Sequence, residues 1–382
     1  MTLAAEQRVP AEVLAAVRAP FEAFGGGWID APTLLPLSLL LDLAGEAMRA
    51  RLLVVQAEGA EDAALRPDFT IPAAQAHLAA GADAGRYLYE GSAFVAPRGP
   101  GRPAEFLQIG AEVFGAPADE PAEDAAVAAL AWAAAQAGGR GDLSLVLGDV
   151  SLFAAFLGSI AIPEAAAARL VRAFAGGRPV QAELARMQDG AAEAPAGAGR
   201  LARLLTDLPE AEAAAVLEEL WRLAGIQPVG GRAPAEIVHR LMTRSEASRA
   251  APLTSAEVEL IGRYLQVSAP VRQALDAVER LAYDAKVEFD VQLRPWVRRL
   301  TALVEAGAPE SAMTLSTGFA RPFGYYDGVL FEVRSAALGP ERPVAAGGRY
   351  DGLIARLGGP EEGSGAVGCM VRPARAWAGG AA

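Results

Sequence analysis

Cysteine and histidine are scarce in this sequence, whose 382 residues include one cysteine, Cys369, and two histidines, His77 and His239. A single cysteine cannot form an internal disulfide, which is typical of proteins kept in a reducing cytoplasm. Zinc sites draw their ligands mainly from clustered cysteine and histidine side chains. We therefore expect a cytoplasmic protein that holds no metal ion and no other cofactor.

Basic residues and long apolar runs are also in short supply. Lysine and arginine together number 34 against 46 acidic residues, so the net charge is −12, whereas proteins that grip nucleic acid usually present a basic surface. No apolar run reaches the roughly 20 residues that a membrane span needs. The N-terminus lacks the basic-then-apolar pattern of a secretory signal. We expect neither nucleic acid nor a membrane among the partners.

Apolar residues, in contrast, are abundant. They make up 52% of the chain, which favours a helix-rich globular protein of about two or three structural units. Apolar spacing and capping residues predict helices over residues 1–24, 119–137, 163–175, 209–224 and 270–283, one helix starting at Thr254, and strands over residues 51–56 and 143–150. The strand over 51–56 should be buried, residues 190–199 form a linker, and Trp221 and Trp296 lie in the core.

Two further β-runs, Arg86 to Val95 and Glu105 to Phe114, flank a loop of proline, arginine and glycine that can be neither helix nor central strand. Side chains alternate in the second run, which places Gln108 and Glu112 on one face with Gly110 between them. An amide and a carboxylate beside a glycine leave a gap where a polar group can sit. Alternatively, both side chains face water on a half-exposed antiparallel strand.

This hairpin resembles motif 2 of the class II aminoacyl-tRNA synthetases, in its histidyl form. The second strand of that motif reads Glu-Phe-x-Gln-x-Gly-x-Glu-x-x-Gly. It is matched by Glu105, Phe106, Gln108, Gly110, Glu112 and Gly115. The first strand departs from the motif, because Val95 replaces the arginine that grips the ATP α-phosphate, and Ala96 and Pro97 replace the acid after it. The resemblance implies that the hairpin of motif 2 is retained and that its ATP-binding chemistry is lost.

Another acid and a hydroxyl stand in the segment LRPDFT, residues 65–70. Pro67 fixes a turn that leaves Asp68 and Thr70 on an extended segment before a helix over residues 73–78. Either side chain can simply cap that helix. The segment also resembles the histidyl synthetase sequence Leu-Arg-Pro-Glu-x-Thr, whose acid and threonine hold the amino group of histidine. The acid of this chain is one methylene shorter.

Two glycine-rich segments, residues 317–333 and 345–353, resemble the histidine-recognition motifs of the same family. The matching positions are Tyr325, Tyr326, Phe331, Glu332, Gly347, Gly348, Arg349, Tyr350 and Asp351. Arg321 stands where the family has the arginine that contacts the histidine carboxylate, although residues 322–324 differ from the family pattern. Taken alone, a pair of adjacent tyrosines is more typical of a core position.

Motif 3 of the family is a glycine-rich strand that leads into a helix with an arginine that stacks on adenine. The corresponding sequence in this chain is GAVGCMVRPARAW, residues 365–377, which departs from the motif. Arg372 falls where the family has a glycine, and Pro373 interrupts the approach to Arg375, which aligns with the adenine-stacking arginine. The sequence stops at Ala382, so we expect no anticodon-binding domain.

The resemblance predicts an α+β fold, with a class II synthetase-like antiparallel sheet flanked by helices. Residues 1–150 and 311–382 form the core, and residues 151–310 form a mainly helical insertion. Residues 28–46 resemble motif 1, a strand carrying Pro32 and then a helix ending near Gly45, which implies a homodimer. An ordinary strand, loop and helix is the alternative for this stretch.

The resemblance also assigns a pocket for free histidine, whose imidazole titrates near neutral pH. It implies Asp68, Thr70 and Gln108 for the ammonium group, Arg321 for the carboxylate, Glu112 and Tyr326 for the imidazole, and Tyr325 as a further candidate. Unpaired polar groups in a closed site are costly, so such a pocket is selective. We expect no catalytic residue.

The family residues that bind histidine are largely present in this sequence, while those that bind ATP and tRNA are largely missing. A protein that binds histidine but cannot activate it suits a histidine sensor. This partition resembles the ATP phosphoribosyltransferase regulatory subunits, relatives of histidyl synthetase that serve the first step of histidine biosynthesis. The resemblance implies a non-catalytic subunit that activates the short catalytic subunit in a hetero-octamer, with L-histidine as feedback effector. Two alternatives stay open: a truncated synthetase-like enzyme that adenylates an amino acid, and a scaffold with a vestigial pocket.

Overall fold

The computed structural model of the protein describes residues 6–44, 46–56, 61–97, 102–188, 208–224, 238, 252–321, 323–360 and 364–380. The predicted linker over residues 190–199, His239, Pro322 and the middle of the hairpin loop lie outside the described residues. Within the described ranges, no helix is long and apolar enough to cross a membrane.

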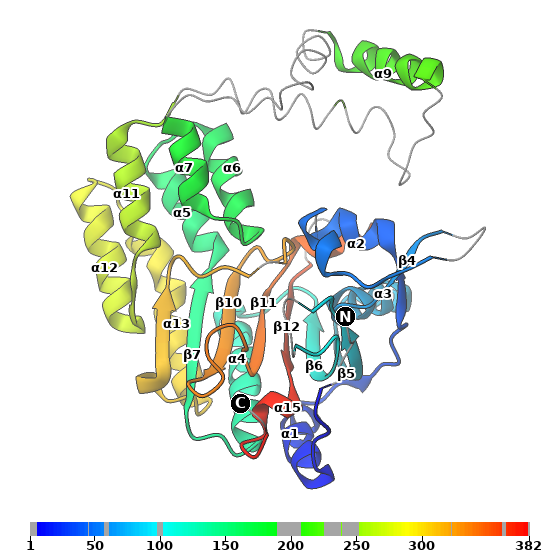
Figure 1. Ribbon diagram of the computed structural model, residues 1–382. Coiled ribbons are helices and arrows are strands. Elements are labelled where there is room, and N and C mark those ends of the chain that lie inside the picture. Colours follow the sequence, from blue (N-terminus) through cyan, green and yellow to red (C-terminus); the bar gives the residue numbers. More distant parts are fainter. Residues whose placement is uncertain are drawn as a thin grey trace.

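A nine-stranded sheet forms the centre of the molecule (Figure 1). Its strands are β1 (Gly27–Trp28), β5 (Gly85–Phe94), β6 (Glu105–Phe114), β7 (Leu143–Asp149), β8 (Ser268–Pro270), β9 (Met313–Ser316), β10 (Val329–Ser335), β11 (Ala345–Arg349) and β12 (Ala366–Val371). They run in the order β1-β5-β6-β12-β11-β10-β7-β9-β8. All neighbours are antiparallel except β1 with β5 and β7 with β9. The predicted α+β class, the strand over 143–150 and both hairpin strands are confirmed.

Helices pack against this sheet, and a further group of helices lies beyond one of its edges. Beside the sheet lie α1 (Ala11–Phe24), α2 (Leu37–Ala44), α3 (Thr70–Ala80), α4 (Glu120–Ala137), α13 (Asp290–Glu305), α14 (Gly352–Arg356) and α15 (Pro373–Ala376), with the 3₁₀ turns η1 (Glu46–Arg51) and η2 (Glu310–Ala312). Helix α4 packs against β10, β11 and β12, because its many alanines allow close approach. Its N-cap is Asp119, which accepts a hydrogen bond from the Ala122 N–H at 3.3 Å.

A lobe of helices lies beyond β7 (Figure 1). It consists of α5 (Val150–Ser159), α6 (Glu164–Ala175), α7 (Val180–Gln188), α11 (Ser255–Leu265) and α12 (Val271–Asp284). The ring of Tyr264 stacks on Phe156 with centroids 4.3 Å apart, and Thr254 forms the predicted capping box with Glu257. Helix α9 (Glu210–Ala224) has a small apolar cluster of its own, against which Trp221 packs.

Within the predicted insertion, residues 151–310, the described elements are helices, the 3₁₀ turn η2 and one strand, β8, which pairs with β9 in the main sheet. Helix α13 also belongs to the layer on α4. Trp296 on α13 is 1% exposed, as expected of a core residue, and its Nε1–H donates to Asp149 Oδ2 at 2.8 Å. The division of the chain at residues 151 and 310 stays a prediction.

A second, three-stranded sheet corrects two predictions about the N-terminal third. Its strands are β2 (Leu34–Pro36), β3 (Val54–Val55) and β4 (Ala63–Leu65), in the order β2-β4-β3. Pro32 lies in irregular chain before β2 and not on a strand, because the carbonyl groups around it bind Arg66 instead of a neighbouring strand. The strand over 51–56 is not buried, since Val54 and Val55 lie on an edge strand and are 41% and 38% exposed.

One buried carboxylate joins three elements of the core. Asp124 on α4 accepts from Arg349 Nε of β11 and from Arg299 Nε of α13, both at 2.7 Å. The three side chains are between 2% and 6% exposed. Further bonds from Arg349 to Glu123 and from Arg299 to Glu120 complete the network. Arg349, although part of a matching recognition motif, therefore holds the helix to the sheet.

Replacing Asp124 with asparagine should lower the free energy of unfolding by roughly 3–5 kcal/mol, because two buried guanidinium groups lose their shared counter-charge. Urea denaturation followed by circular dichroism measures the change. Glu219→Gln is the control, because Glu219 pairs with Arg222 in an exposed position, where an ion pair contributes about 1 kcal/mol or less. Equal losses in the two variants would contradict the role given to this network.

Candidate functional site

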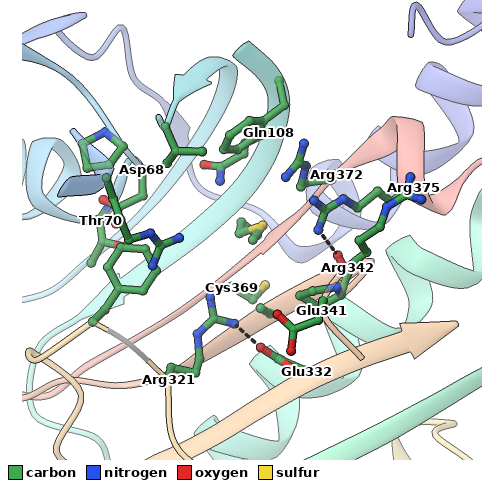
Figure 2. A pocket seen from close by; sticks show the side chains of 18 of the residues that line it. Asp68, Thr70, Gln108, Arg321, Glu332, Glu341, Arg342, Cys369, Arg372 and Arg375 are labelled. Atoms are coloured by element: carbon green, nitrogen blue, oxygen red, sulfur yellow. Dashed lines mark hydrogen bonds and ion pairs between the residues drawn. The ribbon is translucent and has the colours of Figure 1, made fainter. Parts of the chain in front are cut away.

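A cavity of about 760 Å³ lies among the β5–β6 hairpin, the start of α3, residues 319–326 and strand β12. All seven residues predicted for the ligand pocket line it: Asp68, Thr70, Gln108, Glu112, Arg321, Tyr325 and Tyr326. Figure 2 shows Asp68 and Thr70 on one side of the cavity, with Arg321 and Gln108 nearer its middle. The fold therefore brings together residues that are far apart in the sequence, while the ligand contact of each stays a prediction.

Glu112 is the most deeply buried acid of the cavity, at 1% exposed. Thr70 Oγ1 donates to its Oε1 at 2.9 Å, the Tyr89 hydroxyl lies 3.4 Å from the same oxygen, and the Tyr350 hydroxyl donates to Oε2. Burial raises the pKa of Glu112 to about 8, against the opposing effect of the hydroxyl donors. The alternative in which Gln108 and Glu112 face water is wrong, since Gln108 is only 3% exposed.

Two glycines make room for this arrangement. A Cβ on Gly368 of β12 would lie 1.4 Å from Glu112 Oε2, because Gly368 pairs directly with Glu112 across the sheet. A Cβ on Gly110 would lie 2.2 Å from the Tyr89 hydroxyl, since Tyr89 pairs with Gly110. The gap predicted over Gly110 therefore exists, and a phenol of the protein itself projects into it.

Asp68 and Thr70 lie at the start of α3. The Thr70 N–H donates to Asp68 Oδ1 at 3.2 Å, but the N-cap of α3 is Phe69 and has no side-chain cap, so neither Asp68 nor Thr70 is the cap of this helix. The second carboxylate oxygen of Asp68 accepts from the Tyr325 hydroxyl at 3.1 Å, which ties α3 to the segment before β10. Burial raises the pKa of Asp68 above its usual value, and its hydrogen bonds oppose that rise. Thr70 begins the helix and is not on an extended segment, because the Phe69 carbonyl oxygen already accepts a helical hydrogen bond from the Ala73 N–H at 2.9 Å.

Arg321 places a buried positive charge near the middle of the cavity. It is 7% exposed, and its Nη1 lies 3.4 Å from Glu332 Oε1. Its guanidinium carbon lies 5.7 Å from the Tyr326 ring centroid, a cation–π distance. Glu332 is shared with Arg334, at 2.8 Å. Among the described residues, the buried Arg321 Nε and the buried Gln108 Oε1 have no hydrogen-bond partner.

Three residues of the site have no ligand role in the sequence prediction. Tyr350 and Tyr89 bind Glu112, and Glu332 binds Arg321. The sequence feature that could have indicated Tyr89 is the pairing of the two hairpin strands, because their register places Tyr89 opposite Gly110. Tyr350 and Glu332 fall in the matching motifs, so their positions were recognised but their contacts were not.

The lining of the cavity also includes the departures from the synthetase pattern. Val95, Ala96 and Pro97 line it where the resemblance predicts a phosphate-binding arginine and an acid. Arg372 and Arg375 also line it, after the strand that corresponds to motif 3.

Comparison with known proteins agrees with this geometry. The family model described as histidyl-tRNA synthetase matches residues 2–233 and 235–370. The ATP phosphoribosyltransferase regulatory subunit of Brucella anthropi is 32% identical over 351 residues, which cover 91% of this chain and 92% of the relative. The protein of the same name from Brucella abortus is 32% identical over 363 residues, or 94% of each chain. The chain belongs to the ATP phosphoribosyltransferase regulatory subunit family.

Solved structures share the fold. A Bacillus halodurans structure described as an ATP phosphoribosyltransferase regulatory subunit/histidyl-tRNA synthetase aligns with a TM-score of 0.62 at 19% identity, covering 99% of this chain and 82% of the other. A histidyl-tRNA synthetase from Nostoc sp. PCC 7120 aligns with a TM-score of 0.60 at 16% identity, covering 97% and 72%. The predicted class II synthetase-like fold is confirmed.

The raised pKa of Glu112 predicts a pH-dependent stability. The folded protein holds this proton more tightly than the unfolded chain, whose carboxyl has a pKa of 4.5. The stability that Glu112 contributes is therefore fully present below pH 4.5 and is lost as the pH rises to about 8, by at most about 1.4 kcal/mol per pH unit. Glu112→Gln has no such proton, so the wild type should lose stability relative to it across this range.

Urea denaturation of both proteins at several pH values checks this. Parallel stability profiles between pH 4.5 and 8 would show that the folded Glu112 titrates like an ordinary carboxyl group.

Proposed function

We propose that this protein is a non-catalytic regulatory subunit that activates a short ATP phosphoribosyltransferase catalytic chain and relays feedback inhibition by free L-histidine. The names of the Brucella relatives support the first half of this proposal. The cavity supports the second half. In the proposal the protein forms a homodimer within a hetero-octamer of regulatory and catalytic chains in the cytoplasm.

The presence of opposite charges in the lining of one cavity is the observation that carries the proposal. An amino acid brings an ammonium and a carboxylate, and the cavity has Asp68 on one side and Arg321 nearer its middle. The free Oε1 of Gln108 suits a donor, and the free Nε of Arg321 suits an acceptor. Buried polar atoms without partners are costly, so a ligand that satisfies both gains affinity.

Glu112 and Tyr326 suit the imidazole of histidine. Burial holds the pKa of Glu112 at about 8, so at neutral pH this carboxyl carries a proton and accepts hydrogen bonds from three hydroxyls. An imidazole nitrogen that approaches it exchanges a proton or a hydrogen bond with a group of similar pKa. An apolar side chain of the same size offers neither, which gives the site its selectivity.

Val95 supports a binding role over an adenylating one. Amino-acid activation develops negative charge on phosphate oxygens, and enzymes stabilise such charge with preorganised cations or hydrogen-bond donors. A valine at this position on the cavity wall supplies neither. Feedback in turn requires that histidine favour one of two arrangements of the complex, because a ligand with equal affinity for both shifts nothing.

The direct test is an assay of the short phosphoribosyltransferase chain from the same organism, with and without this protein and then with L-histidine. Activity should rise when this protein is added and fall when histidine follows. No activation would overturn the first half of the proposal, and activation that histidine leaves unchanged would overturn the second. Histidine-dependent exchange of pyrophosphate into ATP by this protein alone would identify it as an adenylating enzyme.

Glu112→Gln should weaken inhibition by histidine about two- to tenfold in this assay, because the amide cannot exchange a proton with the imidazole and a hydrogen bond to a neutral group contributes roughly 0.5–1.5 kcal/mol. The readout is the histidine concentration for half inhibition. Glu105→Gln is the matched control, since it makes the same change on the same strand at an exposed residue paired with Ser92. Equal sensitivity of both variants to histidine would place the effector outside this cavity.

A further inference from the structure

Four arginines of the described chain gather at the end of the cavity away from Asp68. They are Arg102 from the loop before β6, Arg342 from the β10–β11 connection, and Arg372 and Arg375 from the end of β12 and from α15. Figure 2 shows Arg342, Arg372 and Arg375 close together on this side. None of them is among the residues proposed to hold histidine.

Two of these arginines, the buried Arg372 and the partly buried Arg375, are incompletely bonded. Arg372 is 6% exposed, lies 3.6 Å from the Phe106 ring centroid and donates to Glu6 Oε1 at 2.5 Å. Arg375 donates to the Pro343 carbonyl oxygen at 2.9 Å, and its Nε lies 3.9 Å from the same Glu6 oxygen. Among the described residues, the Nε atoms of Arg372 and Arg375 have no hydrogen-bond partner.

Positive charge exceeds negative charge at this end. Of the described residues, two acids, Glu6 and Glu341, line it beside the four arginines. Burial lowers the pKa of Arg375 to about 9, and repulsion from Arg372 adds to this. A concentration of buried cations is unexpected in a chain with a net charge of −12, and burying charge without a partner is costly.

Glu6 reaches this site from the segment before α1. Its N–H donates to the Glu105 carbonyl oxygen at 3.0 Å, which holds the segment beside β6. One carboxylate oxygen binds Arg372, and the other is buried without a hydrogen-bond partner among the described residues. A carboxylate of the chain itself therefore occupies a position suited to an anionic ligand.

We propose that this arginine end binds a phosphate-bearing small molecule, a nucleotide or a phosphorylated sugar, and that Glu6 is its tethered competitor. A guanidinium group can bind a phosphate through two parallel N–H···O hydrogen bonds. A phosphate monoester carries a charge of about −1.5 to −2 at neutral pH, which matches the excess of four arginines over two acids. The cavity of about 760 Å³ is in the size range of about 300–1,000 Å³ for drug-sized ligands and leaves room beside an amino acid.

The test is calorimetric titration of the full chain, without histidine, using AMP, ribose 5-phosphate and adenosine as probes. At least one phosphate-bearing probe should bind and adenosine should not; AMP alone would indicate a nucleotide, and both phosphates a site for the phosphoryl group itself. Arg342→Gln should weaken binding about tenfold or more, because it removes a charged donor. Glu6→Gln should tighten binding, because the competing negative charge is gone.

Arg280→Gln, an exposed arginine outside the cavity, is the matched control and should bind as the wild type does. Thermal unfolding of each variant verifies that it is folded. Adenosine binding as well as AMP, no heat from either phosphate, or weaker binding by a folded Glu6→Gln variant would each overturn the proposal. The histidine assay uses other residues, so its failure and the failure of this test are distinguishable.

Discussion

The hydrogen bonding of one buried carboxyl group, that of Glu112, determines the shape of the functional end of this protein. Hydroxyls of Thr70 on α3, Tyr89 on β5 and Tyr350 after β11 converge on it, which ties these three segments together at the cavity wall. The arrangement exists only because Gly368 leaves space where any side chain would collide with Glu112 Oε2. A carboxyl group so enclosed keeps its proton to about pH 8, so the site holds a titratable group poised near the pKa of an imidazole.

The cavity around Glu112 is electrically divided. Asp68 lies at one end, Arg321 lies nearer the middle, and four arginines with two acids, Glu6 and Glu341, lie at the other end. A synthetase uses such a division to bring an amino acid to ATP, and position 95 of this chain supplies a valine where that chemistry needs a cation. Recognition of a small molecule without its activation is what a regulatory subunit requires, and two ligands in one cavity would give a complex two signals to integrate.

The parts of the site that lie on one strand were predictable from sequence, and the parts that depend on distant segments were not. Alternation along β6 placed Gln108 and Glu112 on the same face, as the structure has them. Their burial was not predictable, because the segments that cover them, α3 and the residues before β10, are distant in the sequence. For the same reason Arg349 could be matched to a recognition motif but not to its partner, Asp124 on α4. Strand β8 is another such case, since a strand of three residues inside a helical stretch has no periodicity to detect.

The most direct test of the central claim is calorimetric titration of L-histidine into this protein, alone and in complex with the short catalytic chain, with histamine as the comparison ligand. Histidine should give saturable heat in at least the complex, and histamine should bind much more weakly, because it lacks the carboxylate that Arg321 is proposed to bind. Absence of heat with histidine in both samples would contradict the account. Equal affinity for histidine and histamine would contradict the role of Arg321 while leaving an imidazole site in place.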